Sequence, residues 1–177
     1  MTHNRHNEIV GKSRITARPL RSFLFLLAIV CYTTTALAGV VIRGSVFGGG
    51  NAASVGTTEV NITASTATVQ ASVYGGCNTQ GAVTGNANVN ITGGTVGTVY
   101  GGSGPIADRV FGGGYGQPTL INGNVTVSIG TDGQLTDGAT IHGNVYGGGA
   151  FGSTNASKSG DVWTFYTDGG TAKTTNV

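Results

Sequence analysis

The chain repeats one short phrase, a valine, an aromatic residue and two glycines, five times. The copies begin at Val46, Val73, Val99, Val110 and Val145. A phrase that recurs in this way indicates an array of stacked units rather than one irregular globule. Composition agrees with this interpretation, because 33 of the 177 residues are glycine and only 3 are proline. Frequent glycines without proline-rich tracts suit the corners of a repeated fold.

Short stretches of β-branched residues alternating with polar residues lie between the glycine clusters. Val60-Asn61-Ile62 and Val89-Asn90-Ile91 are two copies, and residues 125–129 form a longer one. This period of two predicts strands with one buried face. A second short strand is predicted before most copies of the phrase, at Ile42, Val69, Val96 and Ile141. We expect no helix after residue 38, because no segment has a capped apolar period of 3.6.

These patterns predict an all-β fold, a parallel β-helix or β-solenoid of about four to five irregular units over residues 39–177. One unit alone buries too little apolar surface to be stable. Stacking pairs each unit with the next at about 4.8 Å and places valine on valine. The main structural alternative is a β-sandwich, which favours hairpin signals over positional repetition.

Stacking also predicts two ladders of side chains. If the valine of each phrase points inward, its aromatic neighbour points outward or into a corner. The aromatic residues then form a candidate surface-binding ladder, which consists of Phe47, Tyr74, Tyr100, Phe111 and Tyr146. Asn61 and Asn90 align in the same way as an amide ladder.

Two irregularities interrupt the array. Val110 follows Val99 after only 11 residues, which indicates a loop with an extra glycine cluster or a half-turn. Near the end, residues 163–169 resemble residues 127–133, and the chain stops before another copy of the phrase. Solenoids need polar caps at their termini. We therefore hypothesise a piece of a longer array, truncated at its C-terminus, or self-association end to end.

The first 38 residues have the pattern of a signal peptide. Arg14, Arg18 and Arg21 precede an apolar run over residues 23–32, and small residues lead up to Ala38. Cleavage after Ala38 is expected. A membrane anchor is the alternative, but a spanning helix needs roughly 20 apolar residues. We expect a secreted protein, extracellular or on a bacterial outer surface, with no transmembrane segment in the mature chain.

Charge and site chemistry exclude several functions. After cleavage four cations and six anions remain, a net charge of −2, with no basic stripe. Nucleic acid is therefore not an expected partner. The single remaining cysteine, Cys77, is expected to be a small turn residue, and no zinc or calcium motif is present. We expect no cofactor, no metal and no catalytic site, so the protein is predicted not to be an enzyme.

Three glycine-rich phrases carry a resemblance to a known group of proteins. Residues 88–96, 97–102 and 143–149 resemble the repeats of large, adhesin-like bacterial surface proteins. The resemblance covers about residues 41–171 and implies a structural or adhesive surface role. The expected partners are host or matrix glycans or proteins. The alternative is a carbohydrate-active enzyme, a lyase or hydrolase on a parallel β-helix, or a glycan-binding fragment. That alternative requires clustered acids on one face.

Overall fold

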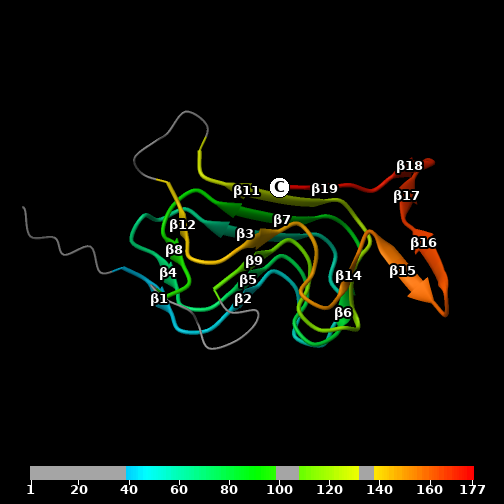
Figure 1. Cartoon of the computed structure of the whole chain (residues 1–177), viewed down its shortest axis with the longest axis horizontal. Helices are drawn as coiled ribbons and strands as arrows, with labels where there is room; N and C mark the ends of the chain where they lie inside the picture. The colour runs from blue at the N-terminus through cyan, green and yellow to red at the C-terminus, as the bar shows by residue number, and fades with distance from the viewer. Residues whose placement is uncertain (1–38, 99–107, 132–137) are drawn as a thin grey trace, which may run out of the picture. The chain divides into compact units, whose positions relative to one another are not determined.

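Nineteen short β-strands and no helix form the described part of the chain, residues 39–98, 108–131 and 138–177 of the computed structural model. These residues belong to one contact unit, Ala38–Val177. Four parallel sheets contain most of the strands, and consecutive strands of one sheet come from successive passes of the chain (Figure 1). The prediction of an all-β fold without helix is confirmed for this part of the chain.

The four parallel sheets, called A to D, alternate along the sequence. Sheet A contains β1 (Val41–Ile42), β4 (Thr68–Val69), β8 (Thr95–Val96) and β12 (Thr140–Ile141). Sheet B contains β2 (Val46–Phe47), β5 (Val73–Tyr74), β9 (Val110–Phe111) and β13 (Val145–Tyr146). Both sheets follow chain order, so each pass of the chain adds one strand to each of them.

Sheets C and D complete each pass. Sheet C contains β6 (Gly81–Val83), β10 (Thr119–Ile121) and β14 (Ser153–Thr154). Val55 joins β6 by a parallel bridge to Val83. Sheet D contains β3 (Thr58–Ile62), β7 (Ala87–Ile91), β11 (Val125–Ile129) and β19 (Thr175–Asn176). We call one pass through the four sheets a rung and the four rungs together the stack.

The register of the stack follows the repeat. In sheet A, Ile42 pairs with Val69, Val69 with Val96, and Val96 with Ile141. In sheet D, Asn61 pairs with Asn90. Parallel strands stacked in register are compatible with the predicted β-helix or solenoid. They contradict the β-sandwich alternative, whose sheets are antiparallel.

The core lies inside the rungs and consists almost entirely of β-branched residues. Val60, Val89 and Val127 are consecutive register partners in sheet D, and each is less than 7% exposed. Ile91 and Ile121 are fully buried. Identical residue types stack on one another because neighbouring rungs lie in register, which gives a dense core with few residue types.

The structure shows how the rungs are built at the two irregularities of the repeat. Val73 pairs with Val46 on one side and with Val110 on the other, so Val110 forms the third rung of sheet B. Val99 itself lies outside the described residues. Residues 163–165 do not take the place of residues 127–129 in a further rung. They belong to an antiparallel hairpin, and β19 completes the fourth rung beside Val125 and Thr126.

The segment between β14 and β19 leaves the stack as two hairpins, which we call the excursion. It contains β15 (Ala156–Ser159), β16 (Val162–Phe165), β17 (Thr167–Asp168) and β18 (Thr171–Ala172). β15 pairs with β16 and β17 with β18, both antiparallel. Figure 1 shows β15 and β16 beside the stack rather than in it. All four residues of β16 are exposed.

Candidate functional site

The aromatic residues of the repeated phrase stack face to face along sheet B. The ring centroids of Phe47 and Tyr74 are 4.7 Å apart, those of Tyr74 and Phe111 are 5.0 Å apart, and those of Phe111 and Tyr146 are 5.1 Å apart. The planes are within 11° of parallel. Strands in register impose this spacing, because adjacent strands are about 4.8 Å apart. Tyr100, the fifth predicted member, lies outside the described residues.

The middle rings of this aromatic ladder are buried, which does not fit a surface-binding role for them. Tyr74 is 2% exposed and Phe111 is 4% exposed, whereas Tyr146 at the end is 38% exposed. The ring of Tyr115, from the turn after β9, packs edge-on against Tyr74 at 5.6 Å. The expectation that Tyr74 and Phe111 offer an exposed contact face is therefore wrong. Burial raises the pKa of the Tyr74 phenol, and a hydrogen bond with Ser72 partly offsets this effect.

The outer face of sheet D is a polar surface in register. Its two rows contain Asn61, Asn90 and Ser128 in one row and Glu59, Asn88, Thr126 and Asn176 in the other. Alternate side chains of β3 are exposed, with buried partners between them. The amide of Asn61 donates a hydrogen bond of 2.8 Å to the carboxylate of Glu59. The predicted alignment of Asn61 with Asn90 is confirmed, within a wider face than the sequence indicated.

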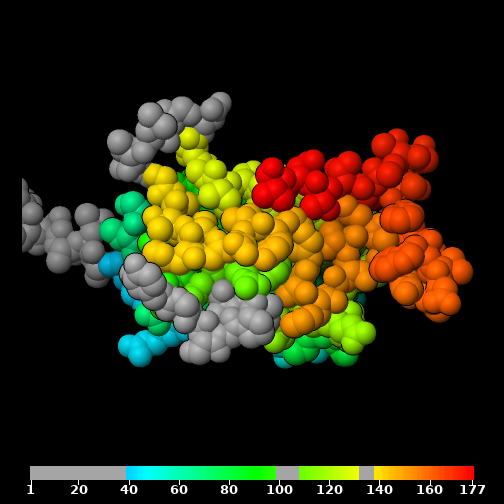
Figure 2. Space-filling model, viewed as in Figure 1, coloured from blue at the N-terminus to red at the C-terminus, as the bar shows by residue number. Residues whose placement is uncertain are grey.

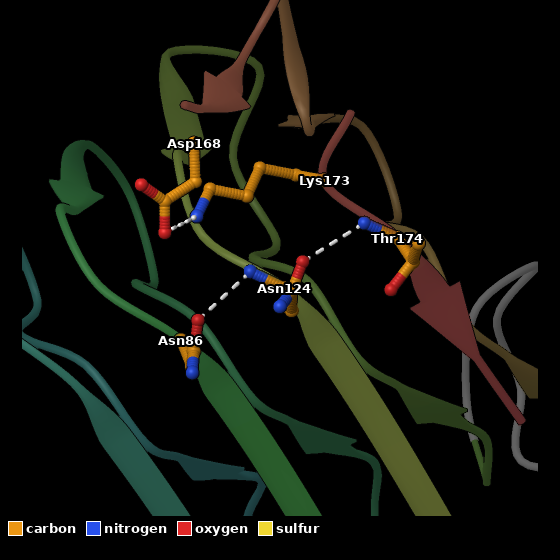
Figure 3. Close-up of polar contacts among 5 residues, drawn as sticks. All are labelled: Asn86, Asn124, Asp168, Lys173 and Thr174. Carbon is orange, nitrogen blue, oxygen red and sulfur yellow. Dashed lines mark hydrogen bonds and ion pairs between the residues drawn. The ribbon is translucent and has the colours of Figure 1, made fainter. Parts of the chain in front are cut away.

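A second polar ladder, missed in the sequence, lies at the corner that precedes sheet D (Figure 3). The backbone N–H of Asn124 donates to the side-chain oxygen of Asn86 at 2.9 Å. The backbone N–H of Thr174 donates to the side-chain oxygen of Asn124 at 2.9 Å. These amides satisfy backbone donors between rungs, so their role is structural. The dipeptides Gly85-Asn86 and Gly123-Asn124, each just before a sheet D strand, were the available signal.

The excursion carries exposed aromatic side chains that sequence analysis did not select. Trp163 is 53% exposed and Phe165 is 69% exposed. Because β16 is extended, these two side chains lie on the same face of the hairpin. Lys158, the register partner of Trp163, places its ammonium 5.6 Å from the centre of the indole ring. The hairpin therefore presents an aromatic surface with a cationic edge.

Groups with catalytic or metal-binding chemistry are scattered. Cys77 is fully buried, and desolvation raises the pKa of its thiol, which disfavours a reactive thiolate. Asp108 is 5% exposed, and its carboxylate accepts a hydrogen bond from the N–H of Thr98 at 3.3 Å. Across residues 39–98, 108–131 and 138–177, no three His, Cys, Asp or Glu side chains lie close enough to hold one metal ion. Asp132 and Asp137, two of the acids that the enzyme alternative could use, lie outside these ranges.

Comparisons with family models, with curated proteins and with solved structures give no match. The resemblance to adhesin-like repeats thus stays a prediction. In the part of the chain that the structure describes, no helix is long and apolar enough to cross a membrane.

Proposed function

We propose that this protein is a secreted or cell-surface repeat protein with a structural or adhesive role. Its residues 1–38 are a cleaved signal peptide and residues 39–177 a parallel β-solenoid. Support for the solenoid comes from the in-register parallel sheets. Support for export comes from the basic and apolar pattern of residues 14–38.

The outer face of sheet D is the observation that carries the binding proposal. It joins strands from all four rungs and displays amide and hydroxyl groups, with Glu59 as its only charged member among the residues in register. Parallel strands set neighbouring members of each row about 4.8 Å apart. A surface of repeated neutral donors and acceptors suits a neutral, repetitive polar ligand. A glycan chain has this chemistry, and low charge on both sides avoids the larger desolvation penalty of buried ions.

The excursion provides the second element of this proposal. Exposed aromatic rings offer apolar faces to which sugar rings can bind, while their edges stay solvated. Trp163 and Phe165 fit this role better than the buried rings of Tyr74 and Phe111. The proposed aromatic contact therefore lies on the hairpin β15–β16 and not in the middle of the aromatic ladder.

A glycan array probed with the exported full chain tests the proposal. We expect binding to neutral polysaccharides, reduced at least about tenfold by Trp163→Ala, which corresponds to about 1.4 kcal/mol of binding free energy. Asn90→Ala on sheet D should weaken binding by a smaller factor. Thr164→Ala is the matched control, because Thr164 lies on the opposite face of β16. Equal binding by wild type and Trp163→Ala would contradict the aromatic contact, and no glycan binding at all would contradict the adhesive role.

A further inference from the structure

The two terminal rungs contain the same apolar residue types as the inner rungs but leave them exposed. Val69 and Val96 of sheet A are 1% and 0% exposed, whereas Ile42, their partner in the first rung, is 40% exposed. Val73 and Val110 of sheet B are fully buried, whereas Val145 of the last rung is only partly buried. In Figure 2 the part of the last rung that contains β12, β13 and β14, coloured yellow to orange, lies towards the viewer. Both ends thus expose apolar side chains at the edges of the sheets.

One glycine position recurs in all four rungs, and a side chain at this position would point towards the C-terminal end of the stack. Its members are Gly49, Gly76, Gly113 and Gly148. A Cβ atom added to Gly49 would lie 2.9 Å from the backbone N of Cys77, in the next rung. A Cβ at Gly76 would lie 2.7 Å from the N of Gly114, and one at Gly113 would lie 2.6 Å from the N of Gly149. The next rung therefore explains glycine at these three positions. At Gly148, in the last rung, the nearest atom is 4.0 Å away and belongs to Thr154 of the same rung.

A second glycine position shows the same pattern towards the N-terminal end. It stands two residues before each of the first three sheet D strands, at Gly56, Gly85 and Gly123. A Cβ at Gly85 would lie 2.5 Å from the hydroxyl of Thr57 in the preceding rung, and one at Gly123 would overlap the carbonyl of Gly85. A Cβ at Gly56, in the first rung, would meet nothing within 4 Å.

Gly56 and Gly148 are not among the glycines with a positive φ, so their backbone conformations do not require glycine. Among the described residues, nothing lies close enough to Gly56 or Gly148 to exclude a side chain. Glycine becomes necessary at Gly148 if another rung stacks on the C-terminal end, and at Gly56 if another rung stacks on the N-terminal end. We infer that the last rung of one copy docks on the first rung of a second copy, so that sheets A to D continue from one chain into the next.

A second copy fits these ends better than an unrelated partner. The occupant of the C-terminal end must offer parallel backbone edges to the four sheets, an aromatic ring beside the partly exposed Tyr146, and a glycine corner that tolerates close backbone contact. The first rung of this chain offers the edges of β1, β2 and β3 with the bridging residue Val55, Phe47 as the ring, and Gly48 and Gly49 at the corner. Its Val41 and Ile42 edge is exposed and available for pairing.

This inference does not depend on glycan binding. Docking of one end on the other is a heterologous interface, which forms an open filament when rotation does not close it. The polar face of sheet D would then extend over many chains. Assembly and binding are measured separately, so either can fail without the other.

Sedimentation velocity of the exported full chain over a wide concentration range is the test. We expect wild type to form linear oligomers. Gly148→Val and Gly56→Val should each weaken association at least about tenfold, because a side chain would occupy the site of the neighbouring backbone. Gly148→Val keeps an intact first rung, and Gly56→Val keeps an intact last rung. An equimolar mixture of the two variants should therefore form a dimer through these two ends and nothing larger.

Gly138→Val is the matched control, because its Cβ would also meet nothing within 4 Å and it occupies neither of the two end positions. Circular dichroism and thermal melting report whether each variant folds, and Gly148→Ala and Gly56→Ala replace any valine variant that does not. A monomeric wild type at all concentrations would overturn the inference. So would unaltered association of folded Gly148→Val, or failure of the mixture to form dimers.

Discussion

The stack and the excursion contain similar alternating residues, but the stack buries the apolar ones and the excursion exposes them. In the stack, Val60-Asn61-Ile62 alternates buried and exposed side chains, and each strand has parallel neighbours in register. In the excursion, Trp163-Thr164-Phe165 has the same alternation, yet all four residues of β16 are exposed on a two-stranded hairpin. The difference shows that burial in this protein comes from the neighbouring rung and not from the alternation itself. We therefore expect the stack to hold most of the stability, whereas the excursion has exposed aromatic surface available for contacts.

The largest effect should come from a side chain placed between two rungs. A Cβ at Gly112 would overlap the side chain of Val125 and the carbonyl of Gly147. We expect Gly112→Val to lower the free energy of unfolding by about 3 kcal/mol or more. Urea denaturation measures this, with Gly138→Val as the control that should change stability by less than about 0.5 kcal/mol. A stable Gly112→Val protein would show that the rungs are not in close contact.

Truncation of one buried and one exposed side chain compares the two regions directly. Ile91 is fully buried in β7, between β3 and β11, whereas Val162 is 67% exposed. Ile91→Ala should cost about 2–5 kcal/mol of unfolding free energy through lost packing. Val162→Ala should cost less than about 0.5 kcal/mol. Similar losses for the two variants, measured by urea denaturation, would mean that the excursion belongs to the same cooperative core.

Asn124 connects the two regions, because its side chain accepts the hydrogen bond of Thr174, where the chain returns from the excursion. Asn124→Ala removes the acceptor and should cost about 1 kcal/mol of unfolding free energy. Asn124→Asp keeps an acceptor oxygen and should retain most of the stability. Thermal melting of both variants measures the difference. Equal destabilisation by Ala and Asp would show that the hydrogen bond is not the cause.

The smallest effect should be a pH dependence that is confined to the stack. Burial raises the pKa of Tyr74 above its ordinary value near 10 in the folded state. The unfolded chain therefore loses this proton first, and stability should fall as the pH rises above about 10. Tyr74→Phe should remove this part of the decline while keeping the ring stack. Denaturation curves at neutral and alkaline pH test it, and an identical decline in wild type and Tyr74→Phe would exclude Tyr74 as its source.

Sequence analysis predicted the parts of the fold that depend on repetition. The pairing of Ile42 with Val69 and of Asn61 with Asn90 follows from positions that recur along the chain. The burial of Tyr74 did not follow, since the ring that covers it, Tyr115, comes from a turn outside the repeated phrase. The hairpin β15–β16 did not follow either. Alternation fixes which side chains share a face but not whether the partner strand is parallel or antiparallel.

The candidate site was predicted less well than the fold for the same reason. The polar row through Asn61 and Asn90 was visible because both members recur at one unit spacing. Trp163 and Phe165 belong to the segment that resembles residues 127–133, and this resemblance indicated another unit of the array and not an exposed aromatic surface. Their exposure became evident only when β16 was placed outside the stack.

The central claim, parallel stacking in register, is tested most directly by nuclear Overhauser contacts in the folded chain. The structure pairs Thr58 with Ala87 and Ile62 with Ile91, and then Ala87 with Val125 and Ile91 with Ile129. We expect contacts between these partners, in this order, from β3 through β7 to β11. Contacts that join Thr58 with Ile91 and Ile62 with Ala87 would show antiparallel pairing and would contradict the stack.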